Sequence, residues 1–81
     1  MVDQEEFRAI CEDCSAALAV YIREANATCV LLGRCTADPS NLEVRKEIGE
    51  QRIRENEAQA DYIRVRQRLF DLMRFGYGEG A

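Results

Sequence analysis

The segment FRAICEDCSAALAVYIREANATCVLL, residues 7–32, decides the fold of this chain. Starting at Phe7, a set of mostly apolar residues recurs at intervals that alternate between four and three. The set consists of Phe7, Cys11, Cys14, Leu18, Tyr21, Ala25, Thr28 and Leu32. Residues with this spacing share one face of an α-helix, and coiled coils use such a face for contact. The segment therefore predicts a long helix that packs against a neighbouring helix.

The first helix has recognisable end signals. Asp3 and Glu6 resemble a helix-capping pair, and Gly33 is a typical residue at the end of a helix. We therefore expect the first helix at residues 3–32. Residues 34–39, which contain the only proline of the chain, predict the interior turn.

The second helix is expected at residues 40–75. Its start has two alternative caps, which are Asp38 with Pro39 at the first helical position, or Ser40 with Glu43 three residues later. Gly76 is expected to end the helix. Residues 1–75 would then form one helical domain, and the glycine-rich residues 76–81 a flexible tail.

Two helices of roughly 30 and 36 residues, joined by a short turn, must fold back into an antiparallel hairpin with arms of roughly 45 and 54 Å. A turn centred at residues 36–37 places Leu18 near Asn56 and Phe7 near Arg66. The last three turns of the second helix would project beyond the first. Residues 43–61 would be mostly solvated, because charges occur on every side of them.

Both helices carry apolar residues on more than one side, so one partner helix cannot cover them. The first helix has a second stripe of Ala16, Ala19, Val20, Ala27 and Val30. The second has one stripe of Leu42, Gly49, Ile53, Asn56, Ala60, Ile63 and Phe70, and another of Tyr62, Val65, Leu69, Leu72 and Met73. The pattern predicts an all-α hairpin that pairs with a second copy into a four-helix bundle. The expected interface residues are Leu18, Tyr21, Ala25, Tyr62, Val65, Leu69, Leu72 and Met73.

Size and composition narrow the class of protein. A domain of 81 residues buries roughly 60% of its unfolded surface, so a monomer is marginally stable and a partner subunit is favoured. The absence of histidine removes the commonest general base and imidazole metal ligand. The net charge of −4 gives no overall attraction to nucleic acid or anionic membranes. We find no stretch of 18 apolar residues, so we expect a cytoplasmic protein without a membrane segment.

Cysteines and carboxylates are the remaining candidates for chemistry. Cys11 and Cys14 form a C-x-x-C motif inside the predicted helix, where core packing is the favoured interpretation over redox or zinc chemistry. Acidic side chains with the spacing of a magnesium site occur at Glu47 and Glu50 and again at Glu57 and Asp61. Four spaced pairs favour a solvated, self-paired helix instead. These pairs are Lys46–Glu50, Glu50–Arg54, Arg54–Glu57 and Asp61–Arg64.

The function expected from these observations is a non-enzymatic protein–protein interaction or structural module, without a cofactor or metal, acting as a helical homo-oligomer that also binds another protein. The alternative is a small regulatory nucleic-acid binder that uses Arg64, Arg68 and Arg74 of the second helix. Asp61 and Asp71 dilute the positive field of these arginines, and no aromatic platform accompanies them.

Overall fold

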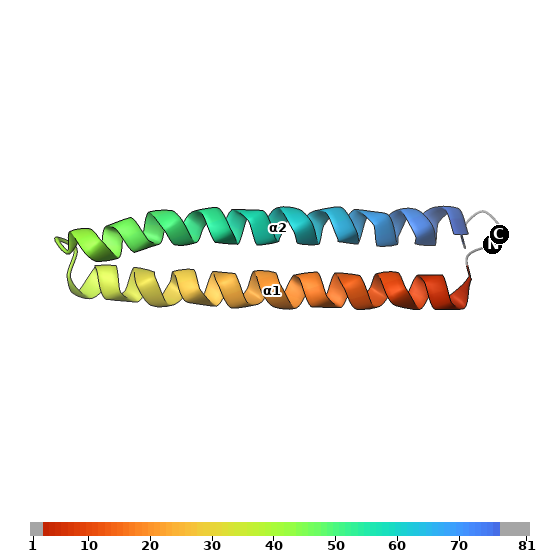
Figure 1. Cartoon of the computed structure of the whole chain (residues 1–81), viewed down its shortest axis with the longest axis horizontal. Helices are drawn as coiled ribbons and strands as arrows, with labels where there is room; N and C mark the ends of the chain where they lie inside the picture. Colours follow the sequence, from red (N-terminus) through yellow and green to blue (C-terminus); the bar gives the residue numbers. More distant parts are fainter. Residues whose placement is uncertain (1–2, 77–81) are drawn as a thin grey trace.

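The computed structural model describes residues 3–76, which form two long antiparallel helices and no strand (Figure 1). Helix α1 covers Gln4–Ala37 and helix α2 covers Leu42–Gly76. They lie side by side over their whole length, in a rod of 59 × 17 × 15 Å with both chain ends at the same end. The predicted all-α helical hairpin is therefore confirmed.

Helix α1 starts as predicted but ends later. The Asp3 carboxylate accepts a hydrogen bond from the Glu5 backbone N–H at 3.2 Å, as an N-cap does. Gly33 lies inside the helix, so the predicted end at residue 32 is wrong. The helix stops at Ala37 because Pro39 forces the preceding residue, Asp38, out of the helical conformation, with φ −144° and ψ 81°.

The N-cap of α2 is a residue that neither of the two expected caps includes. The Asn41 side chain accepts a hydrogen bond from the Val44 N–H at 3.2 Å, so Asn41 starts α2. The Ser40 hydroxyl instead donates to the Asp38 carboxylate at 3.1 Å, within the loop. At its other end α2 includes Gly76, and the rest of the expected tail lies outside the described residues.

The turn is centred between Pro39 and Ser40, three residues later than predicted, and this changes the register of the hairpin. Tyr21 stacks on Tyr62 with ring centroids 6.2 Å apart, and Leu18 no longer faces Asn56. With 34 and 35 residues, the two helices end level with each other. The predicted overhang of α2 is therefore wrong.

The face of α2 that packs on α1 also follows alternating intervals of four and three. Its residues are Val44, Ile48, Gln51, Glu55, Ala58, Tyr62, Val65, Leu69 and Leu72. Of these, Val44, Gln51 and Ala58 are buried, and Ile10 is the buried residue of α1. Residues 43–61 are mostly exposed, as expected, but they also contain the three buried residues of the described part of α2, so the expectation that this half is the less enclosed one is wrong.

The core between the helices is thin. None of the large side chains in residues 3–74 is fully buried, and most residues on the facing sides of both helices are only half-buried. Two helices can cover each other along one line of contact only. The hairpin therefore leaves much apolar surface in contact with solvent.

Helix α1 also meets the criteria of length and composition for a membrane-spanning helix, with an 18-residue window of mean hydropathy 1.2. The window is not an uninterrupted stretch of 18 apolar residues, but it has the composition of a spanning helix, so the expected cytoplasmic location stays a prediction. The criterion tolerates the charged pair Arg23 and Glu24 within α1, and core helices of soluble proteins meet it as well.

Candidate interaction surfaces

A polar layer joins the two helices near the middle of the rod. Gln51, which is only 4% exposed, donates from Nε2 to the Glu24 carboxylate at 2.8 Å and to the Glu24 backbone carbonyl at 3.0 Å. Its Oε1 accepts from Arg54 Nε at 3.1 Å and Nη2 at 2.9 Å. Gln51 thus links a carboxylate of one helix to a guanidinium of the other, and all its polar atoms are satisfied.

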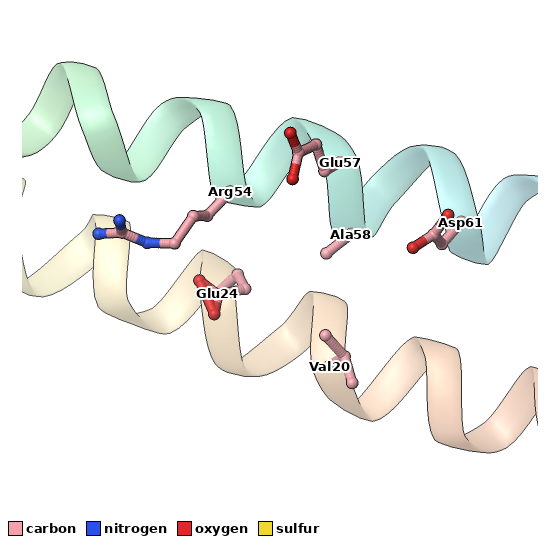
Figure 2. A pocket seen from close by; sticks show the side chains of 6 residues that line it. All are labelled: Val20, Glu24, Arg54, Glu57, Ala58 and Asp61. Carbon is pink, nitrogen blue, oxygen red and sulfur yellow. The ribbon is translucent and has the colours of Figure 1, made fainter.

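A shallow groove of ≈ 230 Å³ lies beside this layer, between the helices (Figure 2). It is lined by Val20, Glu24, Arg54, Glu57, Ala58 and Asp61. Figure 2 shows Arg54 extending from α2 toward α1, whereas the Glu57 carboxylate stays beside α2. We call this flank of the hairpin the groove side. It also carries an exposed ion pair between Arg34 and Glu47 at 3.4 Å.

The carboxylates of the groove side do not assemble into a metal centre. No group of three or more His, Cys, Asp or Glu side chains within residues 3–76 is close enough to hold a metal ion. Hard cations such as magnesium need several oxygen ligands around one point. Glu47 and Glu50 therefore do not combine with Glu57 and Asp61 in this structure.

Of the four ion pairs expected along α2, one forms. Arg64 and Asp61 pair at 2.8 Å, with both side chains more than half exposed. The other three expected pairs are absent from the described part of the chain, and Arg54 bonds Gln51 instead. The prediction of a self-paired helix is therefore wrong for Lys46, Glu50 and Glu57, whose charges face solvent without a partner.

The flank of the hairpin opposite the groove side carries most of the exposed large apolar residues, and we call it the apolar face. We call the row of residues on each helix that packs on the other helix the contact line. On the groove side, this line is flanked by Glu24 in α1 and by Arg54 and Asp61 in α2. Helix geometry places the other flank about half a turn away. The exposed large residues there are Ile22, Leu32, Ile63, Phe70 and Met73.

The residues predicted to form a subunit interface lie largely inside the hairpin. Leu18, Tyr21 and Ala25 of α1 are half-buried and face α2. On α2, the half-buried set that faces α1 includes Tyr62, Val65, Leu69 and Leu72, while Met73 is 45% exposed. The hairpin brings Tyr21 and Tyr62 together. Their contact with a second chain stays a prediction.

The arginines of the alternative nucleic-acid hypothesis do not form an isolated basic patch. Arg64 is neutralised by Asp61. Arg68 and Arg74 are exposed, and the nearby guanidinium of Arg66 lies over the rings of Tyr62 and Phe70, 5.3 and 6.0 Å from their centroids. Stacking on its own neighbours occupies the flat faces that would stack on a nucleobase.

All four cysteines are free thiols. Cys11 and Cys14 lie in α1 on the side that faces α2 and are half-buried, as is Cys35, whereas Cys29 is exposed. A C-x-x-C motif on the inner side of a helix, far from the helix N-terminus, lacks the environment that activates a thiolate.

The residue that sequence reasoning missed is Gln51. Its position on the regular spacing Val44, Ile48, Gln51 is the signal that could have identified it, since a polar residue in an apolar series needs a partner. Comparison of the chain with protein-family models, curated protein sequences and solved structures finds no match.

Proposed function

We propose that this protein is a non-enzymatic protein–protein interaction module that acts as a homo-oligomer, in which two hairpins pack into a four-helix bundle. The observation that carries the proposal is the exposed apolar surface. Within residues 3–74, nine large apolar side chains are 39% to 74% exposed, although the two helices cover each other along their length. A second hairpin that covered part of this surface would remove apolar area from water, which is favourable.

The apolar face is the surface that this bundle would bury. It combines the exposed residues Ile22, Ile63 and Met73 with the half-buried edges of Leu18 and Tyr62. Covering an apolar side chain contributes about 25 cal/mol per Å² removed from water. The groove side is a poorer contact, because it would bring carboxylates such as Glu57 and Asp61 close to their copies.

The proposal assigns no catalytic centre and no cofactor to the chain. In a bundle of two hairpins, the groove side stays open to solvent and presents charged helix surface to another protein. The module would then hold its partners at a spacing fixed by the rod.

The proposal places the protein in the cytoplasm rather than in a membrane. In a bilayer, the apolar window of α1 would bring Arg23 and Glu24 into hydrocarbon, where charged residues are costly. Glu24 is also bonded to Gln51 of α2, a helix rich in charged side chains.

Substitution of an exposed apolar residue tests the bundle without disturbing the hairpin. The variant Ile22→Asp adds a charge to the apolar face at a position that is 50% exposed in the hairpin. We expect it to weaken self-association at least tenfold in analytical ultracentrifugation, because a desolvated carboxylate without a partner is strongly unfavourable.

Val30→Asp is the matched control, since Val30 is exposed on the same helix but lies outside the apolar face. It should leave association unchanged. Equal association of Ile22→Asp, Val30→Asp and the unmodified chain would contradict the bundle.

A further inference from the structure

The side of α2 that points away from α1 carries a third series of residues at alternating intervals of four and three, which we call the outward stripe. It runs through Leu42, Lys46, Gly49, Ile53, Asn56, Ala60, Ile63, Gln67, Phe70 and Arg74. Its large apolar members are 46% to 74% exposed. This is the spacing of a coiled-coil contact, and the large apolar residues of the stripe stay largely exposed in the hairpin.

The two borders of the outward stripe carry opposite charge. One border consists of Glu43, Glu50, Glu57, Arg64 and Asp71, with a net charge of −3 from four acids and one arginine. The other consists of Arg45, Arg52, Gln59, Arg66 and Met73, with a net charge of +3 from three arginines.

We infer that the outward stripe of α2 pairs with the same stripe of a second copy of this chain, with the two α2 helices parallel. In a parallel pair, each residue of one border contacts the residue five positions later on the opposite border of the partner helix. The resulting contacts are Arg45 with Glu50, Arg52 with Glu57, Gln59 with Arg64, and Arg66 with Asp71. Three of the four join opposite charges, and the fourth joins a neutral side chain to an arginine.

An antiparallel pair is excluded by the same charges. It would place each border against its own copy, acid against acid and arginine against arginine, which is unfavourable. The borders therefore specify both the partner, a second copy, and its direction.

Two of the three attractive pairs consist of residues without an intramolecular salt bridge in the described part of the chain, whereas in the third pair Arg66 lies over the Tyr62 and Phe70 rings and Asp71 accepts a hydrogen bond from Gln67 at 2.9 Å. Arg45, Arg52, Glu50 and Glu57 form no salt bridge within residues 3–76, so their charges are available to a second chain. Arg64, whose expected neighbour is the neutral Gln59, is instead neutralised by Asp61 of its own helix.

The polar members of the outward stripe limit the strength of the contact. Lys46, Asn56 and Gln67 interrupt the apolar series, as polar residues do in natural coiled coils that fix register at some cost in stability. We therefore expect a contact that added salt weakens, because the complementary borders are solvated.

This inference rests on the proposed function, self-association, but concerns a different surface. The outward stripe and the apolar face share Ile63 and Phe70, and the basic border of the stripe, which includes Met73, lies on the apolar face; Glu57 borders the stripe on the groove side. If both contacts form, association continues beyond the dimer.

Charge reversal tests the pairing. Arg52→Glu and Glu57→Arg should each weaken association about tenfold in analytical ultracentrifugation, since two symmetry-related attractive contacts become repulsive. The double variant Arg52→Glu/Glu57→Arg should restore the affinity to within about twofold of the starting protein. In an antiparallel pair the single variants would leave the affinity unchanged or raise it, because each reversal would replace a like-charged contact by another like-charged contact or by an attractive one.

Single cysteines test the direction. In a background with the four native cysteines replaced by alanine and the helical content verified by circular dichroism, Gly49→Cys and Gln67→Cys should each form a disulfide with their own copy under mild oxidation. Val30→Cys, on α1, is the control for random collision and should not. A disulfide that forms only when the Gly49→Cys and Gln67→Cys proteins are mixed would overturn the parallel arrangement.

The outcomes separate this inference from the proposed function. If Ile22→Asp weakens association while Glu57→Arg has no effect, the outward stripe is not a self-contact, and the four-helix bundle stands. If Glu57→Arg weakens association and Ile22→Asp does not, the stripe is the contact and the bundle fails. A chain that is monomeric at every concentration would overturn both.

Discussion

Gln51 holds the two helices in one register, because no other side chain on the contact line of α2 bonds polar groups of both helices. Its amide donates to Glu24 on α1 and accepts from Arg54 on α2. A shift of either helix by one turn would leave these groups unpaired, and an unpaired buried polar group is costly. Apolar neighbours such as Ala58 contribute burial but no such directional bond.

We predict that Gln51→Ala lowers the free energy of unfolding by about 2 kcal/mol, because it removes hydrogen bonds to two charged groups. Urea denaturation followed by circular dichroism measures this loss. Gln59→Ala, at an exposed position of the same helix, should change the value by less than about 0.5 kcal/mol. Equal losses for the two variants would show that the polar layer has no special role.

The cysteines differ in their surroundings, and this gives a second prediction for single residues. Replacing the half-buried pair Cys11 and Cys14 by alanine should lower the free energy of unfolding through lost packing, by about 1 kcal/mol or less per site, as measured by urea denaturation. Cys29→Ala should be nearly neutral, since the thiol is exposed. Metal analysis of protein purified without chelator should give the same metal content for the unmodified chain and for the alanine variants. Stoichiometric zinc in the unmodified chain would contradict the packing role of the cysteines.

The ends of the helices depend on how a few local signals compete. The start of α1 could be read directly from Asp3, because a capping carboxylate acts on its own nearest backbone. Gly33 was misleading, since glycine ends a helix only where the backbone turns left-handed, and here no described residue has a positive φ. Pro39 decided the end of α1 instead.

The misplaced turn also limited how much of the interaction surface could be predicted. A turn displaced by three residues moved every cross-helix pair, so Tyr62 and Leu69 were expected beyond the end of α1 instead of against it. Apolar spacing identified the correct face of α1 as far as Thr28, whereas Leu32 is 50% exposed and the buried Ile10 lies beside the series. On α2 the spacing did not show that the second stripe continues toward the loop as the contact line, because Gln51 and Glu55 make that part of the line look polar.

Gly33 and Gly49 lie in helix interiors, and a Cβ atom at either position would have no neighbour within 4 Å. We therefore predict that Gly33→Ala and Gly49→Ala each raise the free energy of unfolding by about 0.5 to 1 kcal/mol, through the higher helix propensity of alanine. Chemical denaturation measures the gain. A loss at either position would mean that another chain approaches the backbone there.

Protection from hydrogen exchange should vary along α2. Val44, Gln51 and Ala58 are buried, whereas Ile63, Phe70 and Met73 are exposed in the hairpin. We predict slower exchange of backbone amides at residues 44–58 than at residues 62–74 when the chain is diluted to a concentration at which it is monomeric, as measured by mass spectrometry. The reverse order would contradict the register of the hairpin.

At the scale of the whole molecule, the shape supports the proposed self-association. A rod of 59 × 17 × 15 Å with two helices has only a thin core, and no large side chain within residues 3–74 is fully buried. Leu69, an expected interface residue, packs on α1, so a charge there would unfold the hairpin as well as any assembly. Exposed positions such as Ile22 separate the two effects.

Sedimentation equilibrium of the unmodified chain, from about 1 to 100 μM, tests the central claim of self-association most directly. The account predicts a mass of at least twice 9.2 kDa at the higher concentrations, falling when salt is added. A single species of 9.2 kDa over the whole range, with helical content unchanged, would contradict it.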